Sequence, residues 1–524
     1  MRKPALDPKG PVTQDGLGAL FSNVLALPIN FWRSVIRHGA PTSTRTRSQS
    51  ITNSLFLHIH SARTHRWTLR KSTTLGLGVA TGVLFLILLG TGVMLMLFYK
   101  PTTAEAYNSI KDIHYVVPGG RLLRNVHRWA TNLMIFTVIL HMARVFYTAA
   151  YKSPREFNWL IGVGLLVLTL ALGFTGYCLP WDQLAYWAVV IGTNIAGSTS
   201  EVTEALNLDG LQHLAMAPRR ILLGSDYIGD AGLLRFYWLH CVALPISMTL
   251  FIAIHLWRIR KDGGISRPTD IRPEELIGTP EDELPHEGFS DPNKRYTLSA
   301  VVPGSSPHVG LDVENTVLSW PHALKYEMVV TSCILALVLL LAIFFDAPLK
   351  EPGNPNVPEN PAKAPWYFLG LQEVVSYSAF AGGMAIPALS VIGLALIPYL
   401  DRSTRQPGRW SDAKERSRIY QSAVFTLVLC IATIGVQVRF GWLRDWFPDI
   451  NQIWIILINP GTIVMFAVIA MSVFETFRSR STRLGAIVFF TGLLVFYGLF
   501  TYFGTVHRGP NWDFYWWPSQ WPEH

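Results

Sequence analysis

The feature that most constrains this chain is a long apolar segment, residues 121–147, that contains two histidines. It reads RLLRNVHRWATNLMIFTVILHMARVFY, and about 20 such residues, at about 1.5 Å each, cross the hydrocarbon core of a bilayer. His127 and His141 are 14 residues apart. In a helix this spacing gives about 21 Å of rise and nearly four turns, so both rings leave the same face. An ionisable ring inside a membrane is costly and needs a specific partner.

A second apolar segment, residues 233–257, repeats this pattern. It carries His240 and His255, which are 15 residues apart, again about four helical turns. Two histidines that hydrogen-bond between helices explain one such pair equally well. Two matched pairs, one bilayer leaflet apart, favour a frame for two stacked haems, each held between neutral imidazoles.

The composition supports a membrane protein with many spans. Half of the 524 residues are hydrophobic, 15% are charged, and the mean hydropathy is +0.28. The net charge of +9 does not indicate nucleic-acid binding, because Lys and Arg gather in alternate loops. The sequence contains no CxxCH motif, so we expect no covalent c-type haem.

The fold class predicted is an all-α polytopic membrane protein, with a four-helix dihaem bundle followed by about five further transmembrane helices. The predicted spans are residues 73–98, 121–148, 157–179, 233–257, 325–346, 382–400, 418–437, 453–476 and 484–505. The loops after the second, fourth, sixth and eighth spans hold most of the Lys and Arg, so we expect these loops and the N-terminus on the cytoplasmic side.

Five regions follow from this reading. They are a basic N-terminal region (1–72), the dihaem four-helix domain (73–260), a hydrophilic linker (261–322), a second helical domain (323–440), and two extra helices with a Trp-rich outer tail (441–524). Residues 16–37 show helical periodicity and predict a helix on the membrane surface, with a disordered tail as the alternative. The Trp-rich tail fits a docking surface for a redox partner or a membrane-interface anchor equally well.

Glycines and arginines share the register of the histidines. The first and third spans each contain a pair of glycines 14 residues apart, where a flat macrocycle would lie against the backbone: Gly78 with Gly92, and Gly162 with Gly176. Packed membrane helices also favour glycine. Cations that would bind haem propionates flank the histidines of the second span: Arg124, Arg128 and Arg144.

These motifs together resemble cytochrome b of the quinol-oxidising bc and bf complexes, over roughly residues 55–440. HRWATNLMIFTVILH, GYCLPWDQLAYWAV and RFYWLH…HLWRIRKDGG are most similar to the chloroplast-type bf branch. The resemblance implies that His127 and His240 bind a low-potential b haem, and His141 and His255 a high-potential one. It also implies that GYCLPWDQ and the PWY loop wall an outer quinol-oxidation pocket, whose residues are Tyr177, Pro180, Trp181, Asp182, Pro365, Trp366 and Tyr367. Their aromatic rings fit interface anchors as well.

The sequence departs from that family at three places. The two halves are fused through the linker, and the cysteine that tethers an extra haem in the bf branch aligns with Gly76. The family's PEWY glutamate aligns with Pro365, which cannot accept a proton. We therefore predict that Glu373, eight residues on, reaches the pocket, with burial raising its pKa, and that Asp182 is the weaker candidate.

The sequence thus predicts the cytochrome b subunit of a quinol:cytochrome c-type oxidoreductase in a prokaryotic cell membrane. One quinol electron would go to a Rieske-type iron–sulfur protein or c-type cytochrome. The other would cross two non-covalent b haems to a second quinone at Arg258, Arg260 and Lys261, residues that positive-inside topology explains equally well. We expect a homodimeric complex. The alternatives are a dihaem membrane anchor without bifurcation and a transporter with a histidine relay.

Overall fold

The computed structural model describes residues 42, 44–52, 54, 57–281 and 315–522. In this part of the chain, nine helical runs are long and apolar enough to cross a membrane. They are α4 (Leu77–Met96), α6 (Gly120–Tyr147), α7 (Glu156–Tyr177), α12–η4–α13 (Asp230–Trp238, Leu239–Ala243, Leu244–Lys261), α14 (Ser319–Phe344), η6–α16 (Ala381–Ala385, Ile386–Leu400), α17 (Ala413–Phe440), α20 (Pro460–Ser479) and α21 (Thr482–Val506). The predicted class, a polytopic helical membrane protein, is confirmed.

Short elements connect and cap these spans. The short helices are α2 (Thr44–Thr52), α3 (Lys71–Thr74), α5 (Ala106–Tyr115), α8 (Gln183–Ala196), α9 (Thr199–Ala205), α10 (Gln212–Ala215), α11 (Ala217–Leu223), α15 (Trp366–Val375), α18 (Leu443–Trp446) and α19 (Gln452–Leu457). The 3₁₀ turns are η1 (Leu57–Ile59), η2 (Arg66–Leu69), η3 (Asp209–Leu211), η5 (Pro273–Leu276), η7 (Pro510–Trp512) and η8 (Pro518–Gln520). Two three-residue strands, β1 (Arg63–His65) and β2 (Thr316–Leu318), pair antiparallel.

A π-helical turn explains why the second histidine spacing is one residue longer than the first. In η4 the N–H of Leu244 donates to the carbonyl of Leu239, five residues back, and the next residue is Pro245, which has no N–H. A π turn inserts one extra residue without a matching advance of the helix. The 15 residues between His240 and His255 therefore cover about the same rise as the 14 residues in α6.

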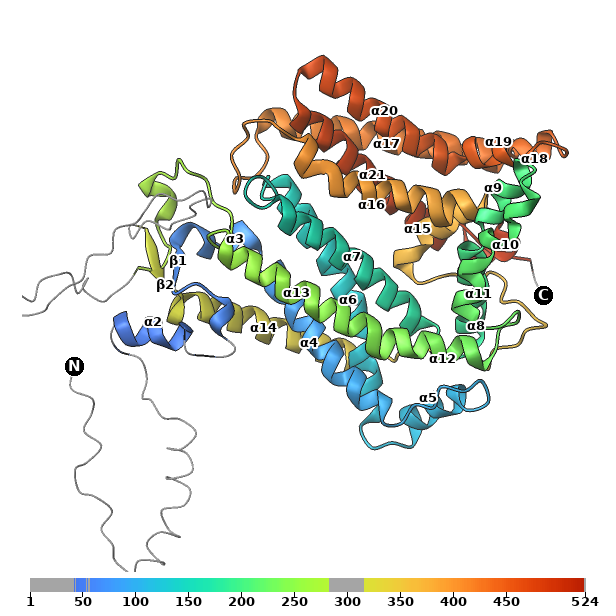
Figure 1. Ribbon diagram of the computed structural model, residues 1–524, viewed down its shortest axis with the longest axis horizontal. Coiled ribbons are helices and arrows are strands. Elements are labelled where there is room, and N and C mark those ends of the chain that lie inside the picture. The colour runs from blue at the N-terminus through green and yellow to red at the C-terminus, as the bar shows by residue number, and fades with distance from the viewer. Residues whose placement is uncertain (1–41, 43, 53, 55–56, 282–314, 523–524) are drawn as a thin grey trace, which may run out of the picture.

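Of the three hydrophobic cores formed by the described residues, two lie within the helix bundles. The first lies between α4, α6, α13 and α14, with Leu84, Met134, Met248 and Val338 at its centre. Met134 is seven residues from both histidines of α6, so this core fills the middle of the bundle. The second core surrounds α21, which packs against α15, α17 and α20 (Figure 1). The last helix is thus a central element of the second half.

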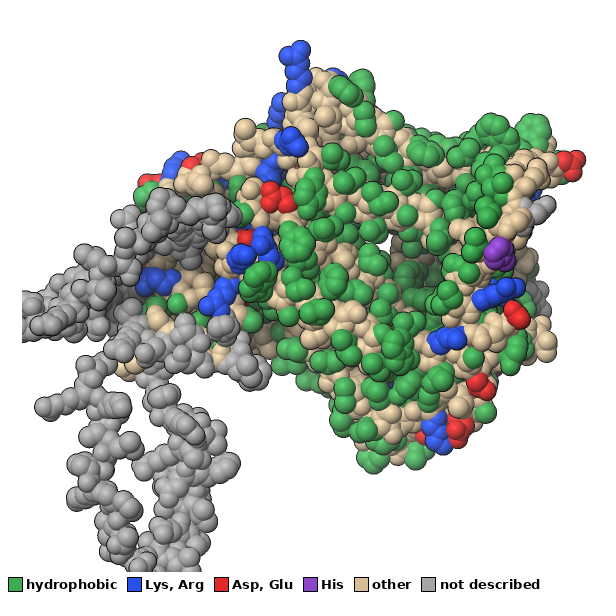
Figure 2. All heavy atoms as spheres, in the orientation of Figure 1, with side chains coloured by type: hydrophobic (Ala, Val, Ile, Leu, Met, Phe, Trp, Pro, Cys, Tyr) green, Lys and Arg blue, Asp and Glu red, His purple; other side chains and the backbone are tan. Residues whose placement is uncertain are grey.

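The basic loops meet at one end of the molecule. Hydrogen bonds join the loop after α6 to the loops after α13 and α16, through Arg155 to Asp262 and through Lys152 to Ser403. The loop after α16 is joined in turn to the start of α21, because the Arg402 N–H donates to Thr482. Figure 2 shows hydrophobic side chains over the middle of the visible face and charged side chains towards its ends.

The eighth predicted span starts at a different residue in the structure, and the predicted surface helix is not described by it. The predicted eighth span, 453–476, is wrong at its start, because Asn459 ends one helix and caps the next. Its Oδ1 accepts from the N–H of Thr462 at 2.9 Å, so α19 is separate and α20 begins at Pro460. The predicted surface helix, 16–37, lies outside the described residues, as does most of the hydrophilic linker.

Candidate functional site

The outer histidine pair is formed by α6 and the π-helical turn η4. The ring centroids of His127 and His240 are 6.2 Å apart, with the planes at 75°. Nδ1 of His240 donates to the carbonyl of Leu172 at 3.1 Å, and Nδ1 of His127 lies 2.9 Å from Oγ1 of Thr91. The Thr91 hydroxyl donates to a helix carbonyl, so His127 is the donor in that pair. Both Nε2 atoms are therefore left unprotonated and able to bind a metal.

The inner pair repeats this geometry about four helical turns away. The ring centroids of His141 and His255 are 6.5 Å apart, and the planes again form an angle of 75°. Nδ1 of His141 is buried and has no hydrogen-bond partner among the described residues. Two parallel helices thus place one histidine pair at each depth, as the sequence spacing requires.

Each histidine faces a glycine on a neighbouring span. Ideal Cβ atoms would lie 3.4 Å from Cε1 of His127 at Gly92 and 2.4 Å from Cε1 of His240 at Gly176. At the inner level the corresponding distances are 3.3 Å from Gly78 to His141 and 4.0 Å from Gly162 to His255. The four glycines therefore stand at the two histidine levels and let the rings approach the helix backbones closely.

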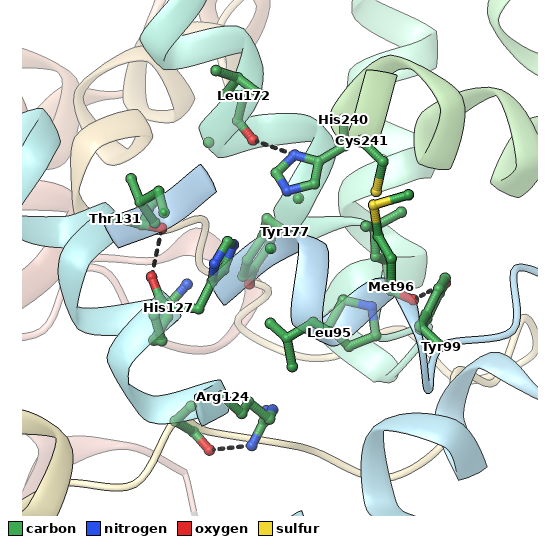
Figure 3. A pocket seen from close by; sticks show the side chains of 18 of the residues that line it. Leu95, Met96, Tyr99, Arg124, His127, Thr131, Leu172, Tyr177, His240 and Cys241 are labelled. Atoms are coloured by element: carbon green, nitrogen blue, oxygen red, sulfur yellow. Dashed lines mark hydrogen bonds between the residues drawn. The ribbon is translucent and has the colours of Figure 1, made fainter. Parts of the chain in front are cut away.

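A cavity of about 250 Å³ opens around the outer histidine pair (Figure 3). Its lining is mostly apolar and includes the polar side chains of Tyr99, Arg124, His127, Arg128, Thr131, Thr169, Tyr177, Asp182, Tyr237, His240 and Tyr367. The hydroxyl of Tyr367 is buried and has no partner in the described part of the chain. Burial raises the pKa of Tyr367 to about 12, so it is a neutral hydrogen-bond donor near pH 7.

The turn after α7 is joined to the proline-rich loop before α15. Trp181 has a left-handed φ of 54°, which is uncommon for a residue other than glycine, and its carbonyl accepts from the N–H of Gly353. The carboxylate of Asp182 accepts from the N–H groups of Ala185 and Lys350, both at 2.9 Å. Asp182 therefore caps α8 and fixes the loop, with both of its oxygens engaged.

A second cavity of about 250 Å³ lies between α7, α8 and α15. Tyr177 and Leu184 line both cavities, so the second adjoins the space around the outer histidines. Among the described residues that line it, none is acidic, and the polar side chains are those of Tyr177, Trp187, Lys363 and Gln372. This is an apolar cavity with a few hydrogen-bonding groups, as small-molecule sites usually are.

Comparison with known proteins assigns the helices that carry the histidines to a protein family. The family model for Cytochrome b/b6/petB matches residues 68–263. The cytochrome b6 of Prochlorococcus marinus (strain SARG) is 41% identical over 192 residues, which are 37% of this chain and 82% of that protein. The chain belongs to the cytochrome b/b6 family. The resemblance drawn from the sequence motifs is thereby confirmed.

Two further comparisons agree with this cytochrome b assignment. The cytochrome b6 of Synechococcus elongatus (strain ATCC 33912 / PCC 7942 / FACHB-805) is 43% identical over 192 residues, or 37% of this chain and 83% of that protein. A solved structure titled Hyperthermophilic respiratory Complex III has a TM-score of 0.53, covering 82% of this chain and 89% of that chain at 23% identity. The second comparison shows a shared fold, and it extends well beyond residue 263.

Cytochromes b bind b-type haems, and both histidine levels fit such a group. An iron held about 2 Å from one nitrogen of each imidazole separates the two ring centroids by about 6 Å. The separations of 6.2 and 6.5 Å match this value. The facing glycines and the apolar outer cavity leave room for a flat macrocycle at the outer level.

The predicted propionate-binding arginines of this cytochrome b lie at both histidine levels, two of them at the outer cavity. Arg124 lines the outer cavity and donates to the carbonyls of Ala347 and Pro348. Arg128 lines the same cavity, with its guanidinium 6.0 Å from the Tyr177 ring centroid. Arg144 donates from Nε to the carbonyl of Thr73, while its buried Nη2 has no partner among the described residues.

The structure corrects the prediction that Glu373 reaches the quinol pocket. Glu373 is fully buried, but it is not among the described residues that line either cavity. Its carboxylate instead forms an ion pair with Arg508, at 2.5 Å from Nη2, and accepts from Tyr377 and Trp512. The carboxylate of Glu373 thus faces the C-terminal tail, which supplies Arg508 and Trp512, and not the cavity. This placement does not favour Glu373 as a proton acceptor.

The other predicted pocket residues do not all line the two cavities. Pro180 lines the first cavity and Pro365 the second. Trp366 is outside both described linings and donates from Nε1 to Asn132 at 2.9 Å. Trp181 is buried against Tyr186.

The predicted inner quinone cluster is partly paired. Nη2 of Arg258 lies 3.0 Å from Oδ1 of the buried Asp262. Nζ of Lys261 lies 4.9 Å from the Trp257 ring centroid. Arg260 lies between Arg258 and Lys261 in the sequence. Burial raises the pKa of Asp262. The sequence reading missed Asp262, although it directly follows the basic cluster.

Sequence reasoning also missed three polar residues of the second cavity, Trp187, Lys363 and Gln372. Nε1 of Trp187 is buried without a partner among the described residues. A signal for it existed, because Leu184, Trp187 and Ile191 recur at helical spacing after the Asp182 cap and share one face of α8. Lys363 carried no comparable signal, because it lies in an irregular loop.

Proposed function

We propose that this chain is the cytochrome b subunit of a quinol:cytochrome c-type oxidoreductase that divides the two electrons of quinol between two acceptors and couples the reaction to proton translocation. The observation that carries the proposal is the second cavity, which shares Tyr177 and Leu184 with the space around the outer histidines. A dihaem anchor without bifurcation needs only one quinone site. Here an outer cavity and an inner basic cluster lie at opposite ends of the histidine helices, which favours two sites.

We assign the histidines as axial ligands of two b haems, His127 with His240 and His141 with His255. The hydrogen bonds at Nδ1 of the outer pair fix the ring orientation and tautomer that metal binding requires. When bound, the haems would supply one-electron transfer between the two faces of the membrane. Nη2 of Arg144, which has no partner among the described residues, would hold an inner propionate, and Arg124 and Arg128 would lie near the outer ones, since they line the outer cavity.

We assign the second cavity to the quinol head group. The buried N–H of Trp187, which has no partner in the described part of the chain, would donate to an oxygen of the quinol ring, because an unsatisfied buried donor is costly. Lys363 lines the cavity, and its Nζ donates to the carbonyl of Thr505 at 2.8 Å. A cation at this position stabilises the anion of a quinol hydroxyl and so promotes its deprotonation without a neighbouring carboxylate. Tyr177, between the two cavities, would orient the head group towards the outer histidines.

We further propose the cellular setting and the partners. The shared end of the basic loops supports a cytoplasmic location for that end, in a prokaryotic cell membrane. A Rieske-type iron–sulfur protein or a c-type cytochrome would take the first electron, and the complex would be homodimeric. Residues 73–260 would form the dihaem domain and residues 323–440 the second domain, with 441–524 as an addition.

Loss of individual haems tests the ligand assignment. We expect His127→Leu to abolish the low-potential haem and His255→Leu the high-potential one, as read from optical spectra and redox titration of the purified complex. Two b-type haems in the double variant His127→Leu/His255→Leu would contradict the assignment.

Bifurcation is best tested in the His255→Leu variant, because quinol can then reduce the outer haem only from the outer side. We expect reduction of that haem by quinol to slow about tenfold or more when the partner redox chain is reduced beforehand, since the first electron then has no acceptor. Equal rates with an oxidised and a reduced partner would favour the dihaem anchor.

A further inference from the structure

The C-terminal segment 507–521, called the tail below, folds back onto the protein. Tyr515 donates from its backbone N–H to the carbonyl of His507 at 2.8 Å, and Arg508 pairs with Phe514 in an isolated β-bridge. The ring of His507 stacks on that of Phe514, with centroids 5.3 Å apart. These contacts within residues 507–515 give the first half of the tail a defined shape.

The tail inserts one buried cation against α15. Nε of Arg508 lies 3.2 and 3.0 Å from the two carboxylate oxygens of Glu373, and its Nη2 lies 2.5 Å from Oε1. The side chains of Arg508 and Glu373 are only 4% and 0% exposed. Nη2 of Arg508 also donates to Gln437 of α17, at 3.1 Å. The ion pair therefore joins the tail, α15 and α17 in one buried network.

Two further side chains, those of Tyr377 and Trp512, donate hydrogen bonds to the Glu373 carboxylate. The hydroxyl of Tyr377 donates to Oε1 of Glu373 at 3.0 Å, and Nε1 of Trp512 donates to Oε2 at 3.0 Å. Nη1 of Arg508 donates to the carbonyl of Trp512 at 2.9 Å. A buried ion pair with this many hydrogen bonds holds its members in one geometry, whatever its net contribution to stability.

The tail also holds the loop that leads into α15. Nδ2 of Asn360 donates to Oδ1 of Asn511 at 2.8 Å, and the N–H of Asn511 donates back to Asn360. Lys363 donates to Thr505 at the end of α21, and its Nζ lies 5.9 Å from the ring centroid of Trp521. The tail and the end of α21 thus hold the loop at Asn360 and Lys363, shortly before Pro365.

That turn and α15 form one wall of the second cavity. Pro365, Phe368 and Gln372 line it, and Glu373 is the next residue after Gln372. The Gln372 amide donates to the carbonyl of Ala362 at 2.6 Å and accepts from the N–H of Ala364 at 2.8 Å, so the loop and α15 move as one unit. A displacement of α15 would therefore change the shape of the cavity directly.

We propose that the tail holds the Pro365 turn and α15, which form one wall of the second cavity, in place through the Arg508–Glu373 ion pair. Arg508 and Glu373 are thus positioning residues for quinol binding. The proposal rests on the proposed function of the second cavity as the quinol site. It gives the tail a role inside the subunit, in place of the partner docking or membrane anchoring expected from its tryptophans.

The test uses the complete complex in membranes, with quinol as substrate. Arg508→Gln leaves the Glu373 carboxylate buried without its cation, and Arg508→Lys keeps the charge but loses the two-pronged contact. The double variant Glu373→Gln/Arg508→Gln removes both charges. Asp513→Asn is the matched control, because Asp513 is an exposed residue of the same tail.

We expect the KM for quinol to rise about tenfold or more in Arg508→Gln and about threefold in Arg508→Lys, since small displacements of binding groups are costly. Haem content and inner-haem reoxidation should stay at wild-type levels. The double variant should return to within about threefold of the wild-type KM, and Asp513→Asn should not differ from wild type.

An unchanged KM together with a lower thermal midpoint would assign the pair to stability alone and overturn the proposal. If Arg508→Gln does not accumulate, the comparison of Arg508→Lys with Asp513→Asn decides, and equal KM values there would also overturn it. Failure of the proposed function would appear differently, as a wild-type complex that does not oxidise quinol at the outer side.

Discussion

The contact between Gly176 and His240 gives a prediction for the outer haem. A methyl group added at Gly176 would stand 2.4 Å from Cε1 of His240 and 3.0 Å from both ring nitrogens. Carbon atoms in contact prefer about 3.5–4.0 Å, so the ring would have to move by about 1 Å or more. The ring is held by the hydrogen bond from Nδ1 to the carbonyl of Leu172, on the same helix as the glycine. We therefore expect Gly176→Ala to displace His240 from its position as a ligand.

The size of the effect follows from the cost of overpacking. Inserting a methyl group into a well-packed site costs about 1–3 kcal/mol, which corresponds to a loss of about 5- to 150-fold in haem affinity. Gly92→Ala is the matched control, because Gly92 faces the same outer level but its added Cβ would lie at 3.4 Å from Cε1 of His127. That separation needs a shift of only a few tenths of an ångström. Any contact of the macrocycle itself with the two glycines affects both variants.

The assay is the haem content of the purified complex, by pyridine haemochrome, with the two haems separated by redox titration. We expect Gly176→Ala to lose most of the outer haem and to keep the inner one. Gly92→Ala should retain more of the outer haem. Equal outer-haem occupancy in the two variants, or a larger loss in Gly92→Ala, would refute the reasoning from ring contact.

Three further predictions concern the quinol site, the haem type and stability. Lys363→Gln removes a cation that stabilises a deprotonated quinol, so we expect the pH profile of quinol oxidation to shift to higher pH; an unshifted profile would contradict this role. Gly76→Cys should still show no haem that resists acid–acetone extraction, because its Cβ would lie 2.7 Å from Cγ2 of Val330. Arg483→Met removes the 2.9 Å partner of the buried Glu415, which among the described residues keeps only Arg405 at 3.4 Å, and should reduce the unfolding free energy by about 3 kcal/mol. In thermal unfolding, Arg483→Met/Glu415→Leu should recover most of that loss, and an equally low midpoint would argue against the ion-pair account.

The sequence alone determined the framework of this cytochrome b. A span that crosses a bilayer must satisfy its backbone internally, so a long apolar run is a helix, and the helical repeat converts residue spacing into position. The 14-residue spacing of His127 and His141 was therefore enough to place them on one face and at two depths. The same rule placed Gly92 and Gly176 at the outer histidine level, where the structure has them.

Local irregularities were only partly predictable. The longer spacing between His240 and His255 was visible, but its cause, the π turn before Pro245, needed the backbone. The interruption at Asn459 was also visible, but whether it bends one helix or separates two depends on capping bonds that a hydrophobicity pattern does not contain.

Only the tertiary structure decided which polar groups meet. Helical spacing suggested that Glu373 points roughly where a pocket residue should, yet its partner, Arg508, lies 135 residues away in a tail with no periodic pattern. Trp187 and Lys363 reach one cavity from α8 and from the loop before α15. A one-dimensional pattern fixes the direction of a side chain relative to its own helix. What lies in that direction is set by the packing of helices far apart in the chain, and for a buried charge that packing decides between a proton acceptor and a structural ion pair.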